Sequence, residues 1–154
     1  MTDPDRAITH GLFTGLSESQ VHAVLQIAHD IWFTDGQTIL QEGREAHGCW
    51  LVHEGQIALT VGVPDASPVV LQTLGPGDVL GWSWLTGPRR WTLSATARGP
   101  VEALEIDTDR LRDLAYEDPA LGYALTRNLL DAALSRMQHT RARLLDVYRS
   151  PRER

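Results

Sequence analysis

The sequence predicts a mainly β fold with flanking helices, in which an antiparallel β-sandwich or barrel is preceded by one helix and followed by others. Between residues 31 and 106 the chain consists of short apolar or alternating runs interrupted by glycine and proline. From Asp107 onward the apolar residues recur at helical spacing. Short strands without long helices between them favour antiparallel pairing, because parallel strands need long crossover connections.

A short amphipathic helix is expected before the β region, over about residues 16–29. Ser17 and Ser19 are N-cap candidates. Apolar residues follow them at helical spacing: Val21, Val24, Leu25 and Ala28.

Six segments are predicted as strands, because each is apolar or alternating and ends at turn-forming residues. They are residues 38–40, 49–52, 56–61, 69–74, 92–97 and 101–106. The predicted breaks contain glycine or proline and lie at residues 35–36, 42–43, 54–55, 64–65, 75–78 and 99–100.

Two helices are expected over about residues 108–149. The first ends at Asp118, because a residue before proline avoids the α conformation, and the second begins at Pro119. The second helix carries a heptad-like apolar stripe that two arginines, Arg127 and Arg141, interrupt: Leu130, Leu134, Met137, Leu144 and Tyr148. This stripe has two interpretations, packing along the chain's own barrel or forming a dimer seam. We expect a homodimer, since the stripe is too long for one small barrel to cover.

Composition narrows the function classes. The chain has 154 residues, which suits a single domain. Its 20 acidic and 14 basic residues give a net charge of −6, which disfavours nucleic-acid binding through a basic face. All the bases are arginine, so lysine chemistry is excluded. The sequence contains neither an apolar run of about 18 residues nor a secretion signal. We therefore expect a cytoplasmic protein that does not contact a membrane.

No arrangement of residues indicates an enzyme or a metal centre. Five residues separate His47 from His53, whereas a cupin-like metal site needs two histidines with one residue between them. Cys49 is the only cysteine and lies in an apolar segment, which favours a core position. Nucleophile-elbow and phosphate-loop patterns are absent. We expect no catalytic residues and no metal.

One segment, residues 74–95, differs from the strand background. A glycine-rich turn leads to Gly81 and to a candidate helical turn at residues 82–85, and a loop with Arg89 and Arg90 follows. Backbone N–H groups at a helix start together with a guanidinium can hold an anion. The alternative is that the paired arginines are merely solvated.

The order of these motifs resembles the cyclic nucleotide-binding domain family, which includes the catabolite activator protein and kinase regulatory subunits. The resemblance covers nearly the whole chain. It rests on Gly36-x-x-Ile39-x-x-x-Gly43, Cys49-Trp50-Leu51-Val52-x-x-Gly55-x-Ile57, Leu74-x-x-Gly77-Asp78-x-Leu80-Gly81 and Pro88-Arg89-Arg90-Trp91-Thr92-Leu93-Ser94-Ala95. It implies one domain over residues 1–154, with an antiparallel β-roll (a double-stranded β-helix or jelly roll) over about residues 31–106 and a long C-terminal helix.

In that family a cassette reading glycine-glutamate-x-alanine-leucine binds the ribose and cyclic phosphate, and an arginine pairs with the phosphate. Gly81 and Leu85 match the cassette, and Arg89 takes the arginine's place, or Arg90 if the register slips by one. Three tryptophans replace residues of the family pattern. Trp82 stands at the glutamate position, Trp84 at the alanine position of the cassette, and Trp91 at the alanine position that follows the arginine. Losing the glutamate's charge-assisted hydrogen bond weakens ribose recognition about 10–100-fold.

The tryptophans have two interpretations. In the first, they stack on a base or line a site for another anion, so that the protein is a regulatory sensor. The ligand is then weakly bound cyclic AMP or cyclic GMP, or another small anion, and the candidate ligand-binding residues are Gly81, Trp82, Ser83, Trp84, Leu85, Arg89, Arg90, Trp91 and Thr92. In the second, the indoles fill the pocket, their N–H groups bond Ser83, Thr86 or Thr92, and the protein is an interaction scaffold without a ligand.

The end of the chain bears on whether the protein binds DNA. The chain ends at Arg154, a few residues past the long helix. We therefore expect no helix-turn-helix domain and no direct DNA binding. The sequence names neither the ligand nor the downstream protein partner.

Overall fold

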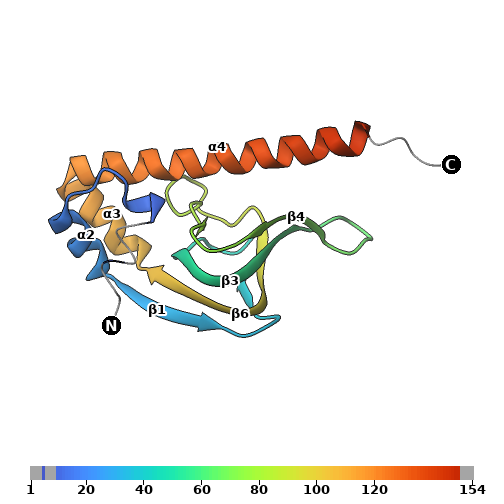
Figure 1. Cartoon of the computed structure of the whole chain (residues 1–154), viewed down its shortest axis with the longest axis horizontal. Helices are drawn as coiled ribbons and strands as arrows, with labels where there is room; N and C mark the ends of the chain where they lie inside the picture. Colours follow the sequence, from blue (N-terminus) through green and yellow to red (C-terminus); the bar gives the residue numbers. More distant parts are fainter. Residues whose placement is uncertain (1–4, 6–9, 150–154) are drawn as a thin grey trace.

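The computed structural model describes residue 5 and residues 10–149, and it has the predicted mainly β fold with flanking helices (Figure 1). A 3₁₀ turn, η1 (Gly11–Phe13), and a helix, α2 (Glu18–Leu25), come first. The strands are β1 (Ala28–Phe33), β2 (Thr38–Leu40), β3 (Cys49–Val61), β4 (Val69–Leu74), β5 (Val79–Leu80) and β6 (Ser94–Ile106). Two helices follow, α3 (Thr108–Glu117) and α4 (Pro119–Arg149).

The sheet is antiparallel at every strand pairing found in residues 10–149. Its strand order is β1-β6-β3-β4, with β2 pairing β6 and β5 pairing β3. The long strand β6 is therefore at the centre, with β1 and β2 along one edge and β3 along the other. Strongly apolar side chains of β3 and β6 are fully buried between the layers of the roll, among them Leu51, Ile57, Leu59, Leu104 and Ile106.

Two pairs of predicted strands are each one continuous strand. Segments 49–52 and 56–61 form β3, and β6 continues through Gly99 and Pro100. The prediction that residues 54–55 and 99–100 break the strands was wrong. Strands β3 and β6 stay paired through these residues, and the pairing only shifts its register near Glu54. Strand β6 begins only at Ser94, so Thr92 and Leu93 precede it, and neither β1 nor the two-residue strand β5 was predicted.

The N-terminal helix is shorter than predicted. It begins after Ser17, whose side chain accepts from the Gln20 N–H while the Gln20 side chain accepts from the Ser17 N–H, a complete capping box. It ends at Leu25, and residues 28–29 belong to β1, where Ala28 pairs with Ile106. Sheet pairing therefore overrides the helical spacing at the C-terminal end of this segment.

Helix α4 has the predicted extent over the described residues and lies along one side of the roll (Figure 1). Only its first half contributes fully buried residues: Leu121, Leu125 and Leu129. Its second half is held to the roll by arginines. Arg136 donates to the Val79 carbonyl at 2.8 Å, and Arg143 donates to the Leu71 carbonyl at 2.8 Å.

Candidate functional site

The cassette segment, residues 81–93, connects the end of β5 to the start of β6. Gly81 has a φ of +92°, and a Cβ there would lie 3.0 Å from the Gly48 carbonyl oxygen and 3.0 Å from the Trp91 ring, so only glycine fits without strain. The Leu85 N–H donates to the Trp82 carbonyl at 3.0 Å. Residues 82–85 make a turn that does not continue into a helix, so the helical turn predicted here was wrong. The amides of a helix start are therefore not available as an anion site.

Two of the three cassette indoles are in the core. Trp84 is 3% exposed and Trp91 is 7% exposed. The Trp84 indole N–H donates to the Gly81 carbonyl at 2.8 Å, so its partner is a backbone carbonyl and not one of the hydroxyl groups predicted. The Trp91 ring lies beside Trp50, with 6.1 Å between ring centroids, and the Trp50 N–H donates to Glu105 at 2.6 Å. The rings of Trp50 and Trp91 therefore contact each other, and both belong with Trp84 to the hydrophobic core.

Trp82 is half-buried and is covered by the C-terminal helix. The guanidinium carbon of Arg136 lies 3.9 Å from the centroid of the Trp82 ring, a cation–π contact. Burial lowers the pKa of Arg136 to about 10, partly opposed by the charge of Asp78, so the guanidinium remains protonated at neutral pH. Sequence reasoning missed Arg136 because it lies far along the chain in α4, and no local pattern there indicates a contact with the cassette.

The two predicted anion-binding arginines do not line the cassette cavity. Arg89 and Arg90 are both exposed. Arg89 has a φ of +56°, and its carbonyl accepts from the Ala46 N–H at 2.8 Å. Arg90 donates to the Gly43 carbonyl at 3.0 Å. The backbone of this pair is thus fixed against the loop at residues 43–46, with the guanidinium groups at its outer surface.

A cavity of about 90 Å³ remains where these elements meet. Five of the predicted residues line it, namely Gly81, Trp82, Ser83, Trp91 and Thr92, together with Arg136 and three apolar residues of the roll. Trp84, Leu85, Arg89 and Arg90 do not line it. Sites for small organic ligands have volumes of about 300–1,000 Å³, so the cavity that remains in the cassette is smaller than such sites.

The sequence profile of the cyclic nucleotide-binding domain matches residues 30–118, more than half of the chain. A putative cyclic nucleotide-binding protein from Geobacter metallireducens GS-15 is 31% identical, with a TM-score of 0.79 over 89% of this chain and 99% of that one. The chain belongs to the cyclic nucleotide-binding domain family. This fold is typical of regulatory and sensor modules, and it confirms both the predicted resemblance and the predicted architecture.

More distant solved structures share the fold. The catabolite activator protein of Thermus thermophilus is 24% identical, with a TM-score of 0.69 over 90% of this chain and 62% of that one. The regulatory domain of Toxoplasma gondii PKA, solved with cAMP, is 17% identical, with a TM-score of 0.70 over 83% of this chain and 48% of that one.

The sequence raised two other candidates outside the cassette, a reactive cysteine and a metal site. Cys49 is fully buried in β3, and burial raises the pKa of its thiol to about 12, so it is not a nucleophile in the folded state. Among residues 10–149 and residue 5, no three histidine, cysteine or acidic side chains group closely enough to hold a metal. No described helix is both long and apolar enough to cross a membrane.

Proposed function

We propose that this protein is a non-catalytic regulatory module of the cytoplasm whose cassette is filled by its own indoles and does not bind a cyclic nucleotide. The observation that carries the proposal is the position of Trp84. Its ring is 3% exposed and its N–H is satisfied by the Gly81 carbonyl, inside the cassette itself. This supports the interaction-scaffold interpretation of the sequence over the sensor interpretation.

Opening the cassette has a high energetic cost. Room for a nucleotide requires the indoles of Trp84 and Trp91 to leave the core, and exposing a large buried side chain costs about 1.5–3 kcal/mol in lost apolar burial. The Trp84 N–H bond and the contact of Arg136 with Trp82 would also be lost. Trp82 supplies no carboxylate for a ribose hydroxyl, so the ligand would not compensate for these losses.

The surface that supports an interaction role is the second half of α4. Its apolar side chains are exposed there, including Leu134 at 43% and Met137 at 61%. They continue the heptad-like stripe, whereas Arg136 and Arg143 face the roll. We assign this stripe to a homodimer seam, because two such helices bury each other's apolar residues at heptad spacing. A further protein partner would then bind the dimer.

A second candidate function is weak binding of a small anion at the rim of the cassette. It is favoured by the arginines exposed together there, Arg44, Arg89 and Arg90. Arg89 is the main candidate to bind the anion, because the Arg90 guanidinium already donates to the Gly43 carbonyl. In this alternative the anion binds outside the indole-filled interior.

Isothermal calorimetry with cyclic AMP, cyclic GMP and inorganic phosphate separates the two functions. For the wild-type protein we expect no saturable nucleotide binding. The double variant Trp82→Glu/Trp84→Ala restores the carboxylate and removes one indole, so we expect it to gain affinity for the nucleotides, and adding Arg89→Ala should reverse that gain. Saturable binding of either nucleotide by the wild-type chain would overturn the proposal.

Titration with inorganic phosphate tests whether the rim of the cassette binds an anion. Saturable phosphate binding that Arg89→Ala abolishes and Arg90→Ala weakens less would establish the second candidate function. Circular dichroism of each variant serves as the control for folding. If phosphate binds neither the wild type nor Arg89→Ala, the rim arginines are solvated side chains only.

A further inference from the structure

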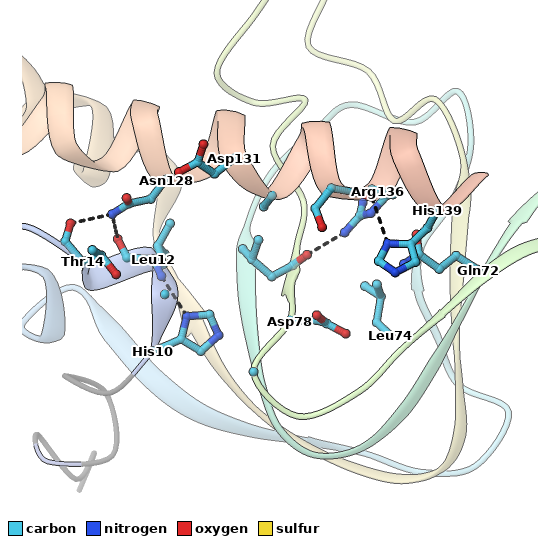
Figure 2. A pocket seen from close by; sticks show the side chains of 15 residues that line it. His10, Leu12, Thr14, Gln72, Leu74, Asp78, Asn128, Asp131, Arg136 and His139 are labelled. Atoms are coloured by element: carbon cyan, nitrogen blue, oxygen red, sulfur yellow. Dashed lines mark hydrogen bonds between the residues drawn. The ribbon is translucent and has the colours of Figure 1, made fainter. Parts of the chain in front are cut away.

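A second cavity, of about 360 Å³, lies between η1, the turn that joins β4 to β5, and the underside of α4 (Figure 2). It is four times the volume of the cassette cavity and shares only Arg136 with it. Its volume is within the range of small-molecule sites. Neither the family resemblance nor the comparisons assign it a role.

His10 presents an unused hydrogen-bond donor to this cavity. Its side chain is 8% exposed, and Nδ1 accepts from the Leu12 N–H at 3.1 Å as the cap of η1. The neutral ring therefore carries its proton on Nε2. Burial lowers the pKa of His10, although the nearby backbone and carboxylate of Asp78 partly oppose the effect, so the ring is neutral at neutral pH. By distance and angle, Nε2 has no hydrogen-bond partner among residue 5 and residues 10–149, although interactions with the backbone of Asp78 and Gly77 raise the pKa of the ring.

Gln72 presents an unused acceptor to the same cavity. It is on β4, and its Oε1 atom is buried without a partner in the described part of the chain. In the view of Figure 2, Asp78 lies between His10 and Gln72. Buried polar atoms without partners are costly, so two of them in one cavity indicate that something else bonds them.

The charged groups of the lining are of both signs, because Asp78 and Asp131 are acidic and Arg136 is basic. Asp78 is on the β4–β5 turn, where its Oδ2 accepts from the Gly75 N–H at 2.8 Å. Its carboxylate and the Gln72 carbonyl favour a cationic donor. The His10 N–H favours an acceptor. A simple anion would meet the carboxylates of Asp78 and Asp131, and a simple cation would meet Arg136 and leave the His10 donor unbonded.

We propose that this cavity binds a small zwitterion of the amino-acid class. Its carboxylate accepts from His10 Nε2–H, and its ammonium group donates to Asp78 and to Gln72 Oε1. The proposal goes beyond the proposed function, because it concerns a different cavity and holds whether or not the cassette binds a nucleotide. Since α4 forms one wall and also carries the apolar stripe, an occupant would contact the helix that we assign to the dimer.

The test is a nuclear magnetic resonance titration of the full chain, with the ring nitrogens of His10 as the reporter. The probes are the standard amino acids, each at millimolar concentration, with acetate and methylammonium as probes that carry only one of the two charges. We expect at least one amino acid to give a saturable shift of His10 Nε2, with acetate and methylammonium at least about tenfold weaker. Absence of a saturable shift with every amino acid would overturn the proposal.

Two substitutions of His10 provide a matched pair. His10→Asn keeps an acceptor for the Leu12 N–H and removes the Nε2 donor, whereas His10→Gln keeps an N–H near the Nε2 position and removes the cap. For His10→Asn and for Gln72→Leu we expect affinity for the binding amino acid to fall about tenfold or more, measured by calorimetry. His10→Gln should retain more affinity than His10→Asn, although it is less stable. Unchanged affinity in both His10→Asn and Gln72→Leu would refute the assignment.

Discussion

Arg136 of α4 and Trp82 of the cassette are in direct contact, with the guanidinium carbon 3.9 Å above the indole ring. The same guanidinium donates to the Val79 carbonyl at 2.8 Å, one residue before the end of β5. One side chain therefore connects the long helix to the cassette and also forms part of the wall of the cavity beneath α4. A displacement of either element must break or move this contact.

We expect Arg136→Ala to destabilise the protein by about 2–3 kcal/mol and to loosen α4. The loss combines a partly buried hydrogen bond from a charged donor with the cation–π contact. Chemical denaturation gives the free energy of unfolding, and hydrogen exchange should show faster opening of residues 137–149. Arg143→Ala is the control, because Arg143 is exposed and loses one hydrogen bond to the Leu71 carbonyl. Equal effects of the two substitutions would contradict a special role for the Trp82 contact.

We expect Leu134→Asp to convert a wild-type homodimer into a monomer, since a carboxylate without a partner in an apolar seam opposes association. Leu134 is 43% exposed in the single chain, so the substitution leaves the monomer folded. Light scattering at micromolar concentration measures the mass. Tyr116→Asp, at an 86% exposed aromatic residue of α3, is the control and should remain a dimer. A monomeric wild-type protein would show that the stripe is not a dimer seam.

Gly55→Ala should destabilise the roll by more than about 3 kcal/mol, whereas Gly36→Ala should cost only about 1–2 kcal/mol. Both glycines have positive φ, +92° and +80°, so both alanines are strained. A Cβ at Gly55 would also overlap the Pro100 carbonyl oxygen on the neighbouring strand, but a Cβ at Gly36 meets nothing within 4 Å. Thermal unfolding of the two variants side by side measures the difference. Similar melting temperatures would mean that β3 and β6 separate easily at Gly55.

Stability should fall as the pH drops below about 6.5, and His10 should cause part of the fall. Burial lowers the pKa of His10 below its ordinary value of 6.5, so the unfolded chain takes up the proton at a higher pH than the folded chain does. The free energy of unfolding is therefore unaffected by this group above 6.5 and decreases below it. Urea titrations over this range should give a shallower slope for His10→Asn, which cannot titrate. An unchanged slope would place the pH dependence on other groups.

The sequence by itself determined the architecture. Glycine and proline punctuate residues 31–106, and the spacing after Asp107 is helical, so the β-roll and the two C-terminal helices follow from local pattern. The order of the glycine motifs also identified the family. Local signals were wrong where pairing partners compete with them, at Gly55, Gly99 and Ala28, because the long strand β6 aligns its neighbours regardless of such breaks.

Only the tertiary structure decided the condition of the cassette. The sequence placed Trp82, Trp84 and Trp91 at the cassette positions, but an indole there can line an open pocket or fill it. The choice depends on Arg136, on Trp50 and on the Gly81 carbonyl, which reach the cassette from α4, from β3 and from the end of β5. The cavity that contains His10 and Gln72 was likewise invisible in the sequence, because its walls come from segments far apart in the chain. Contacts between such segments produce no periodic pattern in the sequence, so they are seen only in the folded structure.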